Sequence, residues 1–123
     1  MTRAWLAIAA IGGFISVAAG AVAAHLASGD PRAATLLRTG ALYGMVHAVA
    51  LLAIAALARH GERPSPVLAI AAWSFVAGIF LFSFSLYALA LTGLAGFAAV
   101  APFGGTALLI GWAALGLHAA RRG

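Results

Sequence analysis

The sequence contains no cysteine and only two acidic residues, Asp30 and Glu62. Without cysteine, the chain can form no disulfide framework, thiolate nucleophile or cysteine-based metal site. Charged residues make up 7% of its 123 residues, whereas soluble domains contain roughly 25%. This shortage of charge excludes an ordinary soluble globular domain.

Hydrophobic residues supply most of the chain. They account for 65% of the sequence, and the net charge of +5 comes from seven arginines without any lysine. The arginines lie near the chain start, in short polar segments and at the C-terminus, which is the usual distribution around membrane spans. A nucleic-acid-binding surface needs a basic patch on a soluble fold, and this chain has no room for one. We therefore expect a membrane protein whose partners include membrane lipids and no nucleic acid.

Four apolar stretches are each long enough to cross about 30 Å of hydrocarbon, which takes about 20 helical residues. They cover approximately residues 5–26, 39–58, 67–91 and 103–119. The first stretch also has the pattern of a secretory signal peptide, but we expect it to be retained as a span. The sequence predicts an all-α integral membrane four-helix bundle that forms one transmembrane domain over residues 1–123.

Capping residues suggest an earlier start for the second span than hydrophobicity does. Asp30 followed by Pro31 is a favourable N-cap and first-turn pair, so the helix could begin there. Arg32 and Arg38 would then lie at the membrane interface. The alternative is an amphipathic surface turn that precedes the span.

The distribution of arginines predicts the orientation of the bundle. If both termini share a side, that side holds five arginines and the other side holds two, Arg32 and Arg38. The larger group comprises Arg3, Arg59, Arg63, Arg121 and Arg122. Because positive residues are enriched on the cytoplasmic side of membrane proteins, we expect both termini to be cytoplasmic.

Small residues recur every four positions along the first span, at Gly12, Ser16, Gly20 and Ala24. Such a face lets a second helix approach closely in a membrane. The partner is another span of the same bundle or, alternatively, a second copy of the chain. The second alternative implies a homo-oligomer or a larger membrane complex.

Polar side chains are expected to gather at one depth, in the outer half of the bundle. The alternating directions of the spans bring to this level His25, Tyr43, His47, Ser83, Ser85 and Tyr87. Pro102 favours the first turn of the fourth span, so the exposed amides of Gly104 and Gly105 would join them. An ionisable residue within a span marks a candidate functional site.

Four segments of the chain, in order, resemble the successive signatures of one family. They read AAGAVAAH, LYGMVHAVALL, FLFSFSLYALALTG and APFGGTALLIGWAAL. The chain resembles the small four-helix membrane proteins filed as domain of unknown function 423, a family that includes animal transmembrane protein 256. The glycine-containing run that ends in histidine in the family's first span reads Ala21-Val22-Ala23-Ala24-His25 here. The resemblance implies a four-helix fold and a multi-pass location in the bacterial inner membrane or a mitochondrial-type membrane, and it implies no established activity.

Three interpretations of the polar residues are open. In the structural one, His25 bonds to the outer loop and His47 bonds to Tyr87 or a serine hydroxyl. In the second, the polar residues line a pocket for a small ligand, a lipid headgroup or an ion. In the third, His25 and His47 ligate a metal or haem iron, although two histidines without a carboxylate nearby supply few ligands for such a site.

The sequence lacks the residues that catalysis and proton-coupled transport normally need. Asp30 and Glu62 fall on opposite sides of the membrane, and a Ser–His pair without an acid is a weak triad. No carboxylate lies within a span to relay protons. We expect a non-enzymatic protein without a cofactor, which acts as an accessory or interaction subunit or binds a lipid or small hydrophobic ligand in its outer half. The alternative is a minimal oligomeric channel or transporter.

Overall fold

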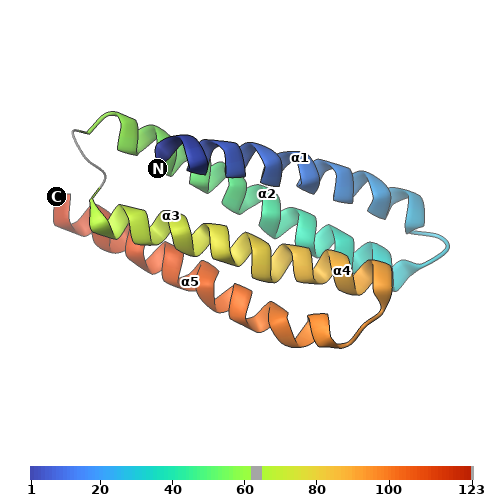
Figure 1. The fold of residues 1–123 in the computed structure, drawn as a ribbon. Coiled ribbons are helices and arrows are strands. Elements are labelled where there is room, and N and C mark those ends of the chain that lie inside the picture. Colours follow the sequence, from blue (N-terminus) through green and yellow to red (C-terminus); the bar gives the residue numbers. More distant parts are fainter. Residues whose placement is uncertain (62–64, 123) are drawn as a thin grey trace.

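The computed structural model describes residues 1–61 and 65–122, and helices occupy nearly all of them (Figure 1). In chain order they are α1 (Thr2–Leu26), α2 (Pro31–Arg59), α3 (Pro66–Gly78), η1 (Ile79–Ser83), α4 (Phe84–Thr92) and α5 (Gly96–Arg122). The segments α3, η1 and α4 follow one another without a break and form a single rod. Each of the four resulting rods is long and apolar enough to span a membrane. The prediction of an all-α membrane four-helix bundle is therefore confirmed.

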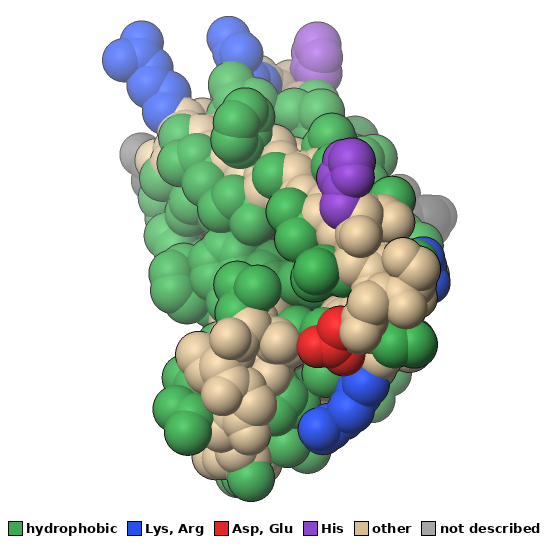
Figure 2. Space-filling model, turned by 90° about the vertical axis from the view of Figure 1, so that its right-hand side faces the viewer, with side chains coloured by type: hydrophobic (Ala, Val, Ile, Leu, Met, Phe, Trp, Pro, Cys, Tyr) green, Lys and Arg blue, Asp and Glu red, His purple; other side chains and the backbone are tan. Residues whose placement is uncertain are grey.

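Neighbouring spans run antiparallel, so the two chain termini lie at the same end of the bundle (Figure 1). We call this the terminus end, and the opposite end, with the connections 27–30 and 93–95, the loop end. The middle of the bundle is formed by α2 and the α3–η1–α4 rod, while α1 packs chiefly on α2 and α5 packs chiefly on the rod. Many large hydrophobic side chains along the spans are exposed, and hydrophobic side chains are also prominent in the view from the loop end (Figure 2). Such a surface suits surrounding lipid.

The arginines separate between the two ends of the bundle. The helix turns nearest the terminus end carry Arg3, Arg59, Arg121 and Arg122. Arg32 and Arg38 lie in the first turns of α2, towards the loop end, and both are exposed. Arg63 lies outside the described residues. Which end faces the cytoplasm stays a prediction.

Two spans begin with the same capping device. The carboxylate of Asp30 accepts a hydrogen bond from the backbone N–H of Ala33 at 3.1 Å, and Pro31 opens α2. The early start of the second span is therefore confirmed, and the alternative of a separate surface turn is wrong. The hydroxyl of Ser65 caps α3 in the same way, because it accepts from the N–H of Leu68 at 3.1 Å.

The fourth span begins earlier than expected. Gly93 ends α4 in the left-handed region, at φ 69°, and α5 starts shortly afterwards at Gly96. Pro102 therefore lies inside the helix, and its predicted place in the first turn is wrong. The alanine-rich segment before Pro102 propagates the helix, and membrane helices tolerate an internal proline because their neighbours satisfy the freed backbone groups. Gly104 and Gly105 consequently lie within the helix, and their amides form no free N-terminus.

The third span contains one turn of π-helix. At η1 the N–H of Phe84 donates to the carbonyl of Ile79, five residues earlier. A π-turn inside an α-helix is uncommon and frequently accompanies a functional site. Both Phe82 and Ser83 belong to this turn, and both belong to the sites described below.

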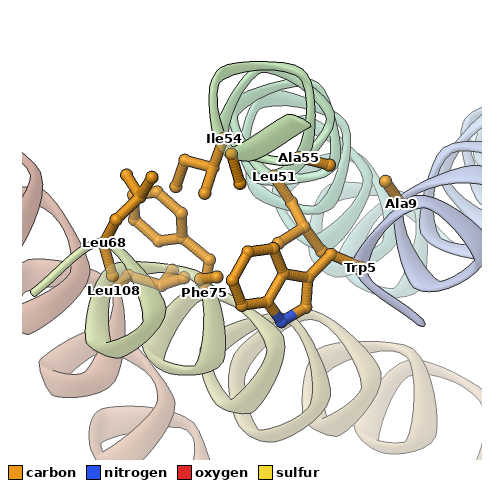
Figure 3. Packing of buried hydrophobic residues seen from close by; sticks show 11 residues of the cluster. Trp5, Ala9, Leu51, Ile54, Ala55, Leu68, Phe75 and Leu108 are labelled. Carbon is orange, nitrogen blue, oxygen red and sulfur yellow. The ribbon is translucent and has the colours of Figure 1, made fainter. Parts of the chain in front are cut away.

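Among the described residues, apolar packing is divided between two clusters. The larger lies towards the terminus end and joins α1, α2, α3 and α5; it comprises Trp5, Ala9, Leu51, Ile54, Ala55, Ala58, Leu68, Ala71, Ala72, Phe75 and Leu108. Figure 3 shows its labelled side chains pointing toward one another between the helices. The smaller cluster lies nearer the loop end and comprises Ala19, Ala23, Leu37 and Tyr87. Between the two clusters lie most of the buried polar side chains.

The buried stripe of α1 differs from the predicted small-residue face. Its members are Trp5, Ala9, Gly12, Ser16, Ala19 and Ala23. Gly12 and Ser16 belong to it as expected, whereas Ala24 is exposed and a Cβ on Gly20 would meet nothing within 4 Å. Four residues turn an α-helix by about 400°, so a strict four-residue repeat drifts by about 40° at each step. The second half of the predicted face is wrong for that reason.

Candidate functional site

His47 lies in the middle of α2 and is only 4% exposed. Its Nδ1–H donates to the carbonyl of Tyr43 at 2.6 Å, and its Nε2 accepts from the indole N–H of Trp112 at 3.0 Å. Because Nε2 is an acceptor, these partners assign the neutral tautomer with its proton on Nδ1. Both ring nitrogens are therefore bonded, as a polar group within hydrocarbon requires.

The partner of His47 differs from the one we expected. The sequence predicts a hydroxyl of the third span as the partner, whereas the bond comes from Trp112 of α5. Ser83 and Tyr87 lie instead against Gly44, about one turn of α2 closer to the loop end. His47 therefore lies about one turn away from these hydroxyls and bonds to the fourth span instead.

Aromatic rings hold His47 in place. The ring of Tyr43 stacks on it, with centroids 6.1 Å apart and planes inclined by 11°. Phe75 and Trp112 meet it edge-on at 5.3 and 5.9 Å, and they meet each other at 5.1 Å. Phe82 packs against Tyr43 with centroids 4.8 Å apart. Because such pairs contribute about 0.5–1.5 kcal/mol each beyond burial, the rings fix the orientation of the imidazole.

A cavity of about 440 Å³ lies beside His47, between α2, η1 and α5. Its lining residues are Tyr43, His47, Phe82, Gly105, Leu108, Leu109 and Trp112. Tyr43 is 43% exposed and Trp112 is 45% exposed, so the cavity opens on the side of the bundle that faces lipid. Ligand pockets of about 300–1,000 Å³ are typically apolar and carry a few polar groups. We name this feature the aromatic cavity.

Three hydroxyl groups from three helical segments converge on Gly44 of α2. A Cβ at Gly44 would lie 2.6 Å from Oγ of Ser16 and 3.2 Å from both Oγ of Ser83 and the hydroxyl oxygen of Tyr87. The Ser16 hydroxyl donates to the carbonyl of Gly12 at 2.8 Å. Within the described part of the chain, the buried hydroxyls of Ser83 and Tyr87 have no hydrogen-bond partner. The absence of a side chain at Gly44 is therefore what lets these spans approach.

The remaining predicted residues lie apart from these two features. His25 is exposed on the last turn of α1. Ser85 is buried, but it is two residues from Ser83 and therefore points to a different side of the helix. Gly104 packs against the main chain of η1, because a Cβ there would lie 2.5 Å from the carbonyl carbon of Leu81. The structure therefore joins Tyr43, His47 and Gly105 at the cavity and Ser83 with Tyr87 at Gly44, and it leaves the others outside.

The two proposed metal ligands are also separate. His25 lies at the loop end, whereas His47 lies deep in the bundle with both nitrogens bonded. Among the residues that the structure describes, no group of three or more His, Asp or Glu could hold a metal ion. Ligation by this pair is not supported by the geometry.

Comparison with known proteins identifies the family. Residues 19–105 match the family described as "Protein of unknown function (DUF423)". The chain belongs to the DUF423 family. A UPF0382 membrane protein of Haemophilus influenzae is 39% identical over 117 residues, which is 94% of this chain and 92% of that protein. The UPF0382 inner membrane protein YgdD of Escherichia coli K12 is 37% identical over an alignment of 128 residues, which covers 98% of this chain and 92% of that protein. The UPF0382 membrane protein YwdK of Bacillus subtilis is 34% identical over 114 residues, which covers 89% of this chain and 90% of that protein.

These DUF423 relatives confirm the resemblance found in the sequence and the membrane location. Their names state no activity, and no solved structure matches the chain. The DUF423 match includes Tyr43, His47, Phe82 and Gly105 of the aromatic cavity and ends before Trp112. A function for this protein therefore has to be inferred from the geometry of the site.

Some residues of the site were missed at the level of sequence. Tryptophan in membrane proteins usually lies at the interface, so Trp112 in the middle of a span was a sign that its N–H needs an internal acceptor. The small-residue pattern predicts only a helix-packing role for Ser16. No sequence pattern links Gly44 with the hydroxyls of other spans, because that contact depends on the register between helices.

Proposed function

We propose that this DUF423 protein is a non-enzymatic protein of the bacterial inner membrane that binds a lipid or small hydrophobic molecule in the aromatic cavity. The observation that carries the proposal is the cavity itself, about 440 Å³ in volume and open to the side of the bundle. Its walls are aromatic and aliphatic, as in ligand pockets generally. A ligand can reach it from the bilayer through this side opening, without passing through either end of the bundle.

The chemistry of the walls limits the ligand. The two nitrogens of His47 are occupied by Tyr43 and Trp112, so the imidazole is neutral and offers no free donor or acceptor. Tyr43 lines the cavity and is half exposed, and its phenol is the polar side-chain group of the lining that remains. These features favour an uncharged, apolar ligand with at most one hydrogen-bonding group.

The competing transport function has less support. On the terminus side of His47 the bundle is filled by the larger apolar cluster, including Leu51, Ile54 and Phe75. A proton or ion pathway through a membrane needs polar or ionisable groups along its length. Assembly as an accessory subunit, a homo-oligomer or part of a larger complex stays a prediction, as does the cytoplasmic position of both termini.

Native mass spectrometry of gently extracted protein tests the proposal. The substitution Gly105→Leu places a large side chain in the cavity, where a Cβ would already lie 3.9 Å from the ring of Phe82. Gly116→Leu is the matched control, because Gly116 is on the same helix and a Cβ there would meet nothing within 4 Å. We expect a co-purifying molecule in the wild type and in Gly116→Leu, and its loss from folded Gly105→Leu. Equal retention in all three proteins would contradict the proposal.

A further inference from the structure

A second, longer depression lies between α1 and α2 on the surface of the bundle. This apolar groove has a volume of about 660 Å³, and its lining residues are Leu6, Ala9, Ala10, Gly13, Phe14, Val17, Ala18, Met45, Ala48, Val49 and Leu52. Gly13 keeps it open, because a Cβ there would meet nothing within 4 Å. Between Leu6 and Ala18 the helix rises about 18 Å, slightly more than half of the ~30 Å hydrocarbon thickness. The groove is therefore about as long as one leaflet of the bilayer is deep.

The groove ends in a basic pocket at the terminus end. This pocket has a volume of about 310 Å³, and its lining residues are Thr2, Arg3, Leu6, Leu52, Ala55, Ala56 and Arg59. Leu6 and Leu52 line both depressions, so the two are continuous. Arg3 comes from the first turn of α1 and Arg59 from the last turn of α2. Asp30, the one acidic residue among those the structure describes, lies at the opposite end of the bundle.

We infer that the groove and the basic pocket together bind one anionic phospholipid from the leaflet at the terminus end. The guanidinium groups of Arg3 and Arg59 hold the phosphate, since a guanidinium forms paired, charge-assisted hydrogen bonds with phosphate oxygens. One acyl chain follows the groove past Gly13 toward Val17. Basic pockets between membrane spans are a recurring form of anionic lipid site. This site is distinct from the aromatic cavity and does not depend on the proposed function.

Charge favours a lipid over a second copy of the chain in this groove. All copies of a membrane protein share one orientation, so a second α1 in the groove would bring its own Arg3 to the same end as Arg3 and Arg59. Like charges at close range repel each other, whereas an anionic headgroup is attracted. A free phosphate ion would satisfy the arginines but would leave the apolar groove without an occupant. The order of the two depressions, basic at the interface and apolar below it, matches a phospholipid.

The test measures binding of phosphatidylglycerol and phosphatidylcholine with identical palmitoyl and oleoyl chains to the full-length protein, by native mass spectrometry. The double substitution R3Q/R59Q removes the two guanidinium groups. Its control is R121Q/R122Q, which removes the same charge from the same end of the bundle, outside the pocket. Gly13→Leu fills the groove, and Gly20→Leu is its control, because Gly20 is on the same helix, has equally open surroundings and does not line the groove.

We expect the wild type to bind phosphatidylglycerol more tightly than phosphatidylcholine. R3Q/R59Q should raise the dissociation constant for phosphatidylglycerol about 30-fold, because each arginine near the surface contributes to the attraction of an anionic lipid. It should also abolish the preference over phosphatidylcholine. Gly13→Leu should weaken the binding of both lipids, while R121Q/R122Q and Gly20→Leu should leave both dissociation constants unchanged.

Three results would overturn the inference. Equal weakening by R121Q/R122Q would show that general basicity, and not the pocket, attracts the lipid. Unchanged binding in folded Gly13→Leu would show that no acyl chain occupies the groove. Displacement of the lipid by inorganic phosphate at low concentration would show that the arginines form a site for the free ion. Circular dichroism confirms in each case that the variant retains its helices.

Discussion

At the level of single residues, the hydrogen bond from Trp112 to His47 joins two spans that are far apart in the sequence. Hydrogen bonds between membrane helices contribute about 1–2 kcal/mol in model systems. Without the indole N–H, the Nε2 atom of His47 would be a buried acceptor with no water to replace the lost donor. The bond therefore stabilises the contact between α2 and α5 and shapes one wall of the aromatic cavity.

We expect Trp112→Phe to lower the free energy of unfolding by about 1–2 kcal/mol, because it retains an aromatic ring and removes the donor. Trp73→Phe is the control, since Trp73 is partly exposed and contacts Trp5 edge-on at a centroid distance of 6.3 Å. The measurement is reversible unfolding in mixed detergent micelles. Equal destabilisation by the two substitutions would show that loss of ring area, and not of the hydrogen bond, is responsible.

At the level of helices, two adjacent glycines of α5 face η1 and have different surroundings. A Cβ on Gly104 would lie 2.8 Å from Cα of Phe82, which is main chain and cannot move aside. A Cβ on Gly105 would lie 3.9 Å from the side chain of Phe82, which is ordinary contact. The first glycine therefore permits the helix packing, and the second leaves space in the cavity.

This difference predicts the result of two alanine substitutions. Gly104→Ala should destabilise the bundle by about 1–3 kcal/mol, the usual cost of overpacking a core. Gly105→Ala should be neutral or slightly stabilising, because alanine favours helix over glycine. Thermal unfolding monitored by circular dichroism compares them. If Gly105→Ala proved the more destabilising of the two, the described contact between α5 and η1 would be incorrect.

Helices and their caps could largely be predicted from sequence, whereas helix register could not. The long apolar runs predicted four spans, and Asp30 with Pro31 predicted the start of α2, because both signals are local. Pro102 lies inside α5 and not in its first turn, because the helix-forming alanines before it outweigh the local preference of proline for the first turn. The partner of His47 and the hydroxyls around Gly44 depend on how far helices slide past one another, which is set by packing across the whole bundle.

At the level of the whole molecule, the distribution of arginines predicts which end of the bundle is cytoplasmic. The chain has no native cysteine, so one introduced cysteine gives an unambiguous label. Gly29 and Gly61 are both exposed and lie in the connections at opposite ends. We expect an impermeant thiol reagent to label Gly29→Cys in spheroplasts with an intact inner membrane and to label Gly61→Cys only after lysis. Labelling of both from the same side would contradict the four-span topology.

Photo-crosslinking measures whether a specific molecule occupies the aromatic cavity in the native membrane. Leu109 lines the cavity and is 71% exposed, whereas its neighbour Ile110 is 50% exposed and does not line it. Adjacent residues differ in depth by only about 1.5 Å, so a photo-crosslinking phenylalanine derivative at either position samples the same level of the bilayer. Intact-protein mass spectrometry after irradiation of membranes should show one discrete adduct for position 109 and a mixture of bulk phospholipid adducts for position 110. The same phospholipid mixture at both positions would show that the cavity holds no specific ligand.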